Sequence, residues 1–286
     1  MVVGRWKLRT RTLSVGQIPL LMGIVNVTPD SFSDGGQFLD PAAAIAHGLQ
    51  LAAEGADLLD IGGQSTRPGS ESVGTDEELR RVMPVLDALG TQTRLPISID
   101  TSKATVAQKA LDAGAEVIND VTALTDDAEM LPLAARTGCG VCAMHMRGTP
   151  RTMQEKPVYK DVVAEVTQYL AERRDALTAA GVEQDRIALD PGIGFGKTLE
   201  HNLALLCHAR RLHTLGCPIL IGHSRKRFIA EVLGDAGVDR TAGTIGVALS
   251  LAVQGVQILR VHDVGAVRQA LLLYAATTGV PRSGVQ

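Results

Sequence analysis

A short apolar run that ends in polar turn residues recurs eight times along this chain, and this repeat constrains the fold more than any other feature. In the first copy, the run LLMGIVN at residues 20–26 leads into the turn-rich segment VTPDSFSDGG. Such a run predicts a strand buried on both faces, as in parallel sheets covered by helices. Stretches with helical spacing of apolar residues separate the runs, so the chain alternates between strand and helix.

The alternation gives a complete set of predicted elements. The predicted strands are residues 20–27, 57–63, 96–101, 117–121, 140–146, 186–191, 218–223 and 256–261. The predicted helices are residues 41–56, 75–90, 103–114, 127–138, 159–180, 199–215, 224–234, 241–255 and 264–278. Asp40 is placed to cap the first helix, and TDEE at residues 75–78 predicts a capping box at the second.

Eight right-handed parallel crossovers close most simply into a single-domain α/β fold, the (β/α)8 or TIM barrel, at residues 20–280. Residues 1–19 alternate and carry basic side chains, which predicts a short N-terminal β-hairpin placed to plug a barrel end. Residues 281–286 remain as a tail. A doubly wound open sheet is the alternative, and the absence of a Rossmann fingerprint disfavours it.

The composition excludes several classes of function. A net charge of −3 argues against general binding of nucleic acid or of a membrane surface. Neither a signal peptide nor an apolar run of 18 residues is visible, so we expect a soluble, cytoplasmic protein. Any anionic substrate must then be bound by locally placed Arg, Lys or His side chains.

Polar residues stand where the predicted strands end. In chain order they are Asn26, the loop Gln64-Ser65-Thr66-Arg67-Pro68, Asp100, Asn119 with Asp120, His145, Asp190, Ser224 with Lys226, and Arg260 with His262 and Asp263. In a barrel these ends meet at one rim, here called the mouth, where active sites lie. Any one Asp or Asn could simply cap the following helix, but polar residues at every strand end favour a site.

The residues at the mouth divide by chemistry into three groups. Compact acceptors suit the N–H groups of a neutral heterocycle, and these are Asp100, Asn119 and Asp190. Cationic groups suit phosphate oxygens, and these are Arg67, Lys226, Arg260 and His262. Hard oxygen ligands suit Mg²⁺, and these are Asn26 with Asp30 or Asp34. The alternatives remain that Arg67 and Lys226 are surface charges and that His262 is structural.

The glycine-rich segment GIGFGKT, residues 192–198, is not a phosphate-binding loop of a known type. A Walker A motif needs a glycine five positions before the glycine of GK, and that position is Pro191. The alternating glycines also lack G-x-G-x-x-G spacing. We interpret the segment as a flexible strand-to-helix loop that presents Phe195.

The chain resembles the dihydropteroate synthase family over residues 20–280. The matching segments, one per strand end and in the family's order, are MGIVNVTPDSFSDGG, DIGGQSTRPG, SIDTSK, INDV, MHMRGTPRTMQ, LDPGIGFGKT, IGHSRKRF and RVHDV. The resemblance implies a folate-pathway transferase. It would join 6-hydroxymethyl-7,8-dihydropterin diphosphate to para-aminobenzoate with Mg²⁺, releasing pyrophosphate.

The resemblance also implies a role for each site residue. The pterin set is Asp100, Asn119, Asp190, Lys226, Met144 and Gly222. The diphosphate set is Asn26, Thr66, Arg67, Arg260 and His262, with Asn26 on the metal side. The para-aminobenzoate set is Arg67, Pro68, Phe195 and Ser224. The residues expected to act in catalysis are Lys226, Arg67, Asp34, Arg260 and His262.

Three positions depart from the family pattern: Gln64, His223 and Arg227. The residues at positions 223 and 227 motivate the hypothesis that sulfonamides, the expected competitors of para-aminobenzoate, bind this chain poorly. Two other functions stay open, a pterin-dependent methyltransferase domain and a paralogue that binds pterins without turnover. The resemblance further suggests a homodimer formed through the Ala- and Leu-rich helices at residues 241–255 and 264–278.

Overall fold

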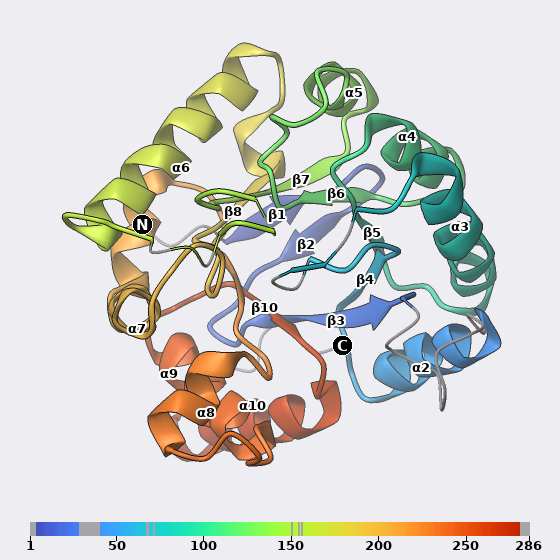
Figure 1. Cartoon of the computed structure of the whole chain (residues 1–286). Helices are drawn as coiled ribbons and strands as arrows, with labels where there is room; N and C mark the ends of the chain where they lie inside the picture. Colours follow the sequence, from blue (N-terminus) through green and yellow to red (C-terminus); the bar gives the residue numbers. More distant parts are fainter. Residues whose placement is uncertain are drawn as a thin grey trace.

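Eight parallel strands form one sheet that curves into a barrel inside a ring of helices (Figure 1). This computed structural model describes residues 4–28, 41–66, 69–70, 72–149, 151–153, 155 and 157–280. The barrel strands are β3 (Leu20–Asn26), β4 (Leu58–Gly62), β5 (Ile97–Asp100), β6 (Val117–Asp120), β7 (Gly140–Met144), β8 (Ile187–Asp190), β9 (Leu220–Gly222) and β10 (Ile258–Val261).

The sheet closes between β8 and β9. Its strand order is β8-β7-β6-β5-β4-β3-β10-β9, and a parallel bridge between Leu189 and Ile219 joins the two ends. The Leu189 N–H donates to the Pro218 carbonyl oxygen over 2.9 Å. Because the described strand pairs of the barrel are parallel, their carboxyl ends share one rim. The predicted (β/α)8 barrel is confirmed, and the open-sheet alternative is wrong.

The helices pack their apolar faces against the outside of the barrel, where they form the larger of two hydrophobic clusters. They are α2 (Pro41–Ala53), α3 (Thr75–Gln92), α4 (Ala104–Asp112), α5 (Met130–Thr137), α6 (Val162–Ala179), α7 (Leu199–Cys207), α8 (Arg227–Leu233), α9 (Thr241–Val253) and α10 (Val264–Thr278), with 3₁₀ turns η1 (Gln184–Arg186) and η2 (Ala209–Leu215). The helical break predicted within residues 234–240 separates α8 from α9, and both helices follow β9.

A hairpin plugs the amino-terminal end of the barrel. Strands β1 (Arg5–Lys7) and β2 (Thr12–Ser14) pair antiparallel, which confirms the predicted hairpin. Trp6 is fully buried and joins a second hydrophobic cluster inside the barrel, with Leu20, Leu58 and other residues from the beginnings of the strands. The Trp6 indole N–H donates to the Arg186 carbonyl oxygen over 2.9 Å. The plug therefore supplies the floor of the barrel interior.

Two local predictions are wrong. The helix expected to run through residue 215 ends at Cys207, and a 3₁₀ segment follows it. Its buried residues Ala209, Leu212 and Leu215 recur every three positions, which matches the three residues per turn of a 3₁₀ helix.

The capping box predicted at the start of α3 is also absent. The N-cap is Gly74, so Glu78 falls one position beyond the place that a capping box requires. Glu78 is instead fully buried and accepts from the Lys103 ammonium over 2.5 Å. A capping box forms at α7, where Thr198 and His201 exchange side-chain and backbone bonds.

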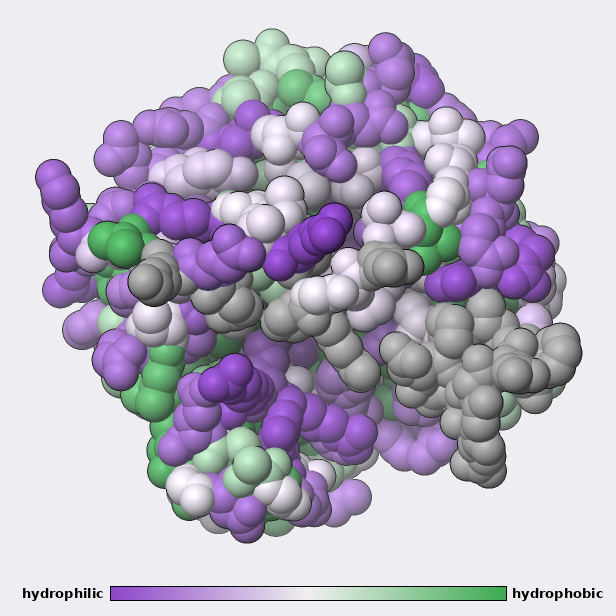
Figure 2. Space-filling model, viewed as in Figure 1, coloured by the Kyte–Doolittle hydropathy of each residue, from purple (hydrophilic) through white to green (hydrophobic). Residues whose placement is uncertain are grey.

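The surface on the side shown in Figure 1 is mostly hydrophilic, with hydrophobic residues in small scattered areas (Figure 2). Among the described residues, no helix combines the length and the apolar character needed to cross a bilayer. The apolar residues instead fill the two clusters on either side of the sheet.

The hairpin should contribute to global stability. Replacing Trp6 by Ala removes a fully buried indole, so the free energy of unfolding should fall by roughly 3–5 kcal/mol. Trp6→Phe keeps most of the apolar volume and loses the bond to Arg186, so its loss should be about 1 kcal/mol. Urea unfolding followed by circular dichroism measures both. Wild-type stability in Trp6→Ala would mean that the hairpin is not part of the cooperative unit.

Candidate active site

The strand ends bring polar residues together at the mouth, as the sequence predicts. Asn26 pairs with Gly62, Gly62 with Asp100, and Asp100 with Asn119, so these positions form one row across four adjacent strands. Asn119 is buried, whereas Asn26 and Asp100 are half-buried. Since registered neighbours point to the same side of a sheet, the side chains of this row face one space.

Two further registered pairs lie on the other strands of the mouth. Met144 pairs with Asp190, and Gly222 pairs with Arg260. A Cβ atom at Gly222 would stand 3.8 Å from the Arg260 Cβ and 3.9 Å from its Cδ, so the glycine leaves room beside the arginine stem. Met144 and Gly222 were expected at a pterin slot, and the register places each next to a charged residue.

Arg260 joins two carboxylates in the upper barrel interior. Its Nε donates to Asp60 Oδ2 over 2.6 Å, and its Nη2 donates to Asp100 Oδ2 over 2.7 Å. Asn119 donates from Nδ2 to the same Asp60 oxygen over 3.0 Å. Asp60 is fully buried. One guanidinium thus fixes the positions of two acids that come from neighbouring strands.

The charges of this cluster shift one another's pKa values. Burial raises the pKa of Asp100 to about 7, against the lowering effect of Arg260 and with the help of the negative Asp60. Burial alone would lower the pKa of Arg260, but the Asp60 and Asp100 carboxylates raise it above its usual value. The guanidinium therefore stays charged, whereas the protonation of Asp100 responds to small changes in the charges around it.

Asp190 and Lys226 form the second half of the mouth. The Gly192 N–H donates to Asp190 Oδ1 over 2.7 Å. Burial raises the pKa of Asp190, and the nearby Lys226 ammonium opposes this shift. Lys226 donates to the Ile193 carbonyl oxygen, and its Nζ lies 4.7 Å from the centre of the Phe195 ring. Burial lowers the pKa of Lys226 to about 8.

Ser224 and His262 lie in contact between these halves. The Ser224 Oγ accepts from the His262 backbone N–H over 3.2 Å and stands 3.1 Å from His262 Nδ1. Arg225 makes a two-pronged ion pair with Asp263, with Nε and Oδ2 2.9 Å apart. The turns after β9 and β10 are thereby fastened to each other.

Part of the predicted site lies outside the described residues. Asp34, Arg67 and Pro68 are in this part, as is Asp30. Thr66 is half-buried in the segment that follows β4. The roles expected for these residues stay predictions.

Sequence reasoning missed several charged residues that hold the mouth together. Asp60 lies within the second apolar run, two positions before the strand end, and the period of two in a strand could have placed it in the same interior. Lys103 donates to Gln64 Oε1 over 2.6 Å and also to the buried Glu78, so it ties the turn after β4 to α3. Nothing in the sequence pattern indicates that three-way contact.

The departures at positions 223 and 227 do not point toward the row of strand-end acceptors. His223 is fully buried, and its Nε2 lies 3.1 Å from the Thr244 carbonyl oxygen on α9. Burial lowers the pKa of His223 to about 4. The Arg227 side chain is 87% exposed and pairs with Glu231 on its own helix over 2.6 Å. These contacts are explained by helix packing and by a surface ion pair.

The donor set at the mouth can be compared with the needs of a divalent metal. The described residues contain no group of three or more His, Cys, Asp and Glu side chains placed to hold a metal ion. Asn26 offers one amide oxygen at the end of β3. A single protein oxygen fits Mg²⁺, which keeps several waters and takes its other ligands from substrate phosphates, and does not fit a metal held by a protein cage.

Comparison with known proteins places the chain among pterin-binding proteins. The model of the pterin binding enzyme family matches residues 22–262. A dihydropteroate synthase from Neisseria meningitidis serogroup B is 48% identical over 264 residues, which cover 90% of this chain and 92% of that protein.

Solved structures agree with that result. The dihydropteroate synthase of Xanthomonas albilineans with 4-aminobenzoic acid is 48% identical, with a TM-score of 0.89, and covers 97% of this chain and 99% of that one. The Yersinia pestis enzyme in a sulfonamide drug complex is 42% identical, with a TM-score of 0.90, and covers 96% of this chain and 100% of that one.

Removing Arg260 should destabilise the folded protein, because two buried carboxylates lose their counterion. In Arg260→Leu the free energy of unfolding at pH 8 should fall by roughly 3–5 kcal/mol, because Asp60 and Asp100 become buried charges without a partner. The loss should shrink toward pH 5. Unpaired buried acids have raised pKa values in the folded state, so the folded protein takes up protons as the pH falls and gains stability.

Urea unfolding at the two pH values measures this effect. Arg227→Leu is the matched control, since the Arg227 side chain is 87% exposed, and it should leave the unfolding midpoint unchanged. An equal loss at pH 5 and pH 8 in Arg260→Leu would assign the effect to lost packing instead of charge.

Proposed function

The chain belongs to the dihydropteroate synthase family of pterin-binding enzymes, and from this we propose the reaction that it performs. It joins 6-hydroxymethyl-7,8-dihydropterin diphosphate to para-aminobenzoate and yields 7,8-dihydropteroate and pyrophosphate. The observation that carries the proposal is the meeting of ring acceptors and cations in one space. Asp190 and Arg260 stand close enough to shift each other's pKa.

The acceptors at the mouth suit the pterin ring. Asp100, Asn119 and Asp190 come from three strands and present oxygens to a shared interior. A carboxylate accepts two parallel N–H bonds from an aminopyrimidinone edge. Lys226 stands beside Asp190 as a donor for ring acceptors. Met144 and Gly222 complete the slot, one as an apolar wall and the other by leaving space.

The cations suit the diphosphate. Arg260 uses Nε and Nη2 for the Asp60 and Asp100 carboxylates, and we assign its Nη1 to a phosphate oxygen. His262 lies at the end of β10 beside Ser224. In the proposal Thr66 and Arg67 complete this set from the turn after β4, and Asn26 from the end of β3.

Mg²⁺ is the proposed cofactor. The Asn26 amide oxygen would hold it together with diphosphate oxygens and water. When bound, the ion supplies positive charge that stabilises the departing pyrophosphate.

The chain's own residues carry the remaining work of the reaction. The C–O bond between the exocyclic methylene and the diphosphate breaks, and Arg260, His262 and Arg67 stabilise the negative charge that develops on the leaving group. The electron-rich dihydropterin, held by Asp100 and Asp190, supports positive character on the methylene carbon. The arylamine nitrogen then forms the new C–N bond and loses its proton to water.

The amine half of the site is assigned to the turns around the mouth. Phe195 and Ser224 flank the position that the ring would take, with Arg67 and Pro68 from the turn after β4. Asp34 belongs to the segment between β3 and α2, which in the proposal lies over the bound diphosphate. Holding the amine and the carbon together supplies much of the rate acceleration, so no strong base is required.

Sulfonamides should compete with para-aminobenzoate for the same half of the site. The Yersinia pestis relative forms a complex with a sulfonamide drug, which supports this proposal. The hypothesis of poor sulfonamide binding receives no support from His223, which points toward α9, or from Arg227, which pairs with Glu231 on its own helix. Similar inhibition constants in the wild type and in a His223→Met variant would remove that hypothesis for position 223.

The methyltransferase alternative is disfavoured by the retained cations. A methyl transfer has no leaving diphosphate, so it would not need Lys226, Arg260 and His262 around one space. Experiment can distinguish the active enzyme from a paralogue without turnover, since the paralogue would bind the pterin and release no pyrophosphate.

We also propose a homodimer through α9 and α10. These helices pack side by side on the outside of the barrel (Figure 1). Val253 on α9 and Leu273 on α10 are large hydrophobic residues with exposures of 55% and 67%. Sedimentation of the wild type should give twice the mass of one chain, and Leu273→Glu should shift it toward the monomer. A wild-type monomer at micromolar concentration would exclude the dimer.

The reaction has a direct test. Wild-type protein should release pyrophosphate only when the pterin diphosphate and para-aminobenzoate are both present. Asp190→Asn should weaken binding of the pterin diphosphate by about 10- to 100-fold, since a hydrogen bond to a charged group contributes roughly 1.5–3 kcal/mol. Asp112→Asn, an exposed change on α4, is the control. Calorimetric titration measures binding, and undiminished affinity in Asp190→Asn would refute the proposed pterin site.

A further inference from the structure

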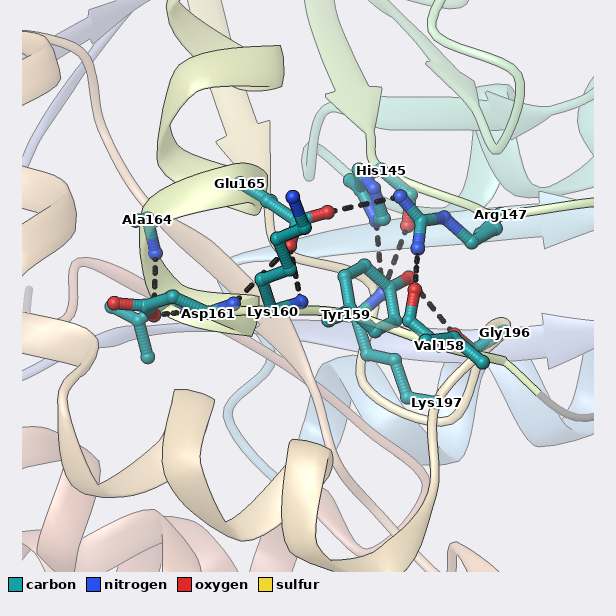
Figure 3. Close-up of polar contacts among 11 residues, drawn as sticks. His145, Arg147, Val158, Tyr159, Lys160, Asp161, Ala164, Glu165, Gly196 and Lys197 are labelled. Atoms are coloured by element: carbon teal, nitrogen blue, oxygen red, sulfur yellow. Dashed lines mark hydrogen bonds and ion pairs between the residues drawn. The ribbon is translucent and has the colours of Figure 1, made fainter.

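Lys197 is a buried lysine to which the reaction assigns no role. Its side chain belongs to the last part of the glycine-rich segment and is only 3% exposed. Its Nζ lies 3.0 Å from His145 Nδ1 and 3.4 Å from the His145 carbonyl oxygen (Figure 3). It also lies 3.0 Å from the Phe195 carbonyl oxygen. An ammonium has three donors and no acceptor, so these three atoms match its capacity.

The contact fixes the state of His145. Burial lowers the pKa of His145 to about 3, so the ring is neutral near pH 7. When Lys197 is protonated, its ammonium donates to Nδ1, and the ring proton is then on Nε2. The ring packs edge-on against Tyr169, with centroids 4.8 Å apart, and lies 6.1 Å from Tyr159. His145 is therefore a rigid acceptor at the end of β7.

The glycine-rich segment lies directly on the residues that follow β7. A Cβ atom at Gly192 would stand 2.0 Å from the His145 carbonyl oxygen, and one at Gly196 would stand 2.4 Å from the Arg147 carbonyl oxygen. Both glycines have positive φ angles, 68° and 62°. The Tyr159 hydroxyl donates to the Gly196 carbonyl oxygen over 2.9 Å. This packing accounts for Gly192 and Gly196, and it replaces the expected flexible loop with an anchored one.

The other face of the segment forms part of the mouth. The Gly192 N–H binds Asp190, the Ile193 carbonyl oxygen accepts from Lys226, and the Phe195 ring lies beside the Lys226 ammonium. Lys197 therefore binds the backbone of the segment on the side away from the mouth. The Phe195 ring extends from the side that faces the mouth. A shift of the backbone at Phe195 would move its ring relative to the Lys226 ammonium.

The surroundings of Lys197 exclude two other roles. An open cleft of about 440 Å³ beside α6 is lined by His145, Arg147, Tyr169 and neighbouring residues, and Lys197 is not part of its lining. The ammonium therefore does not bind a ligand there. A nucleophile would need access to a reacting atom, whereas this nitrogen is enclosed by the three acceptors.

We propose that Lys197 is a positioning residue for the amine half of the site. By joining the end of β7 to the glycine-rich segment, its ammonium sets the Phe195 ring against Lys226, where the proposed function places para-aminobenzoate. The inference rests on that proposed function. It concerns the placement of the amine and leaves binding of the pterin diphosphate unaffected.

A Lys197→Met variant distinguishes an effect on para-aminobenzoate from an effect on the pterin diphosphate. Met fills a similar volume without donors, so the KM for para-aminobenzoate should rise about tenfold or more, because small misplacements of a reacting partner are costly. The dissociation constant of the pterin diphosphate should stay within about twofold of the wild type. Lys160→Met, the same change at an exposed lysine, is the control and should alter neither value.

A double-mutant cycle with Phe195→Ala tests the route of the effect. If Lys197 acts through Phe195, the double variant should have about the same KM for para-aminobenzoate as Phe195→Ala alone. Effects that multiply would mean that Lys197 acts elsewhere and would overturn the inference. An unchanged KM in Phe195→Ala would instead contradict the proposed amine site, so the two failures are distinguishable.

The pH profile adds a readout that a purely structural role would not move. Burial lowers the pKa of Lys197 to about 7, so the ammonium loses a proton and one hydrogen bond as the pH rises through this value. The wild-type KM for para-aminobenzoate should rise between pH 6 and pH 8. The charged groups around Lys197 are Asp190, Lys226 and Arg147, and all are retained in Lys197→Met.

The part of the rise in KM between pH 6 and pH 8 that depends on Lys197 should therefore be absent in Lys197→Met. A folded variant is recognised by its retained pterin binding and its unfolding midpoint. If it keeps the wild-type KM for para-aminobenzoate and the wild-type pH profile, Lys197 does not position the amine. If Lys197→Met fails to fold, Lys197→Gln provides the same comparison with one donor group retained.

Discussion

An arginine between two acids determines how polar the top of this barrel can be. Arg260 contacts Asp60 and Asp100 on neighbouring strands, and Asp60 has no solvent exposure. Without a cation, two carboxylates could not both stay charged in that interior. The guanidinium therefore permits an acidic pocket, proposed for the pterin, inside an α/β barrel. The pocket in turn keeps the guanidinium aligned beside the place proposed for the leaving group.

The barrel interior is consequently divided along its axis. Near the beginnings of the strands it is apolar and closed by Trp6 and its hairpin. Near the strand ends it is filled by Asp60, Asn119, Asp190 and Arg260. Burying apolar surface at the floor contributes stability that offsets the cost of burying charged groups at the mouth. The hairpin thus belongs to the function as well as to the fold.

The sequence predicts the strand ends well because each depends on a local pattern. An apolar run followed by Asn26, Asp100 or Asp190 marks a buried strand, and parallel topology then brings the ends together. The contacts across the barrel are different in kind. Arg260 and Asp60 are separated by 200 positions, and only closure of the sheet in one register makes them neighbours. No local spacing encodes such a pair.

The spacing of the glycine-rich segment argues against a phosphate loop, but the reason for its glycines is visible only in the structure. Its composition resembles a loop that wraps phosphate, yet Gly192 and Gly196 are required by close contact with the backbone after β7. Backbone that approaches backbone so closely must also satisfy its carbonyl groups, and Lys197 does so for His145 and Phe195. A buried ammonium is costly unless its donors are used. Its placement behind Phe195 is therefore best explained by a requirement for a fixed loop at the site where the amine is proposed to bind.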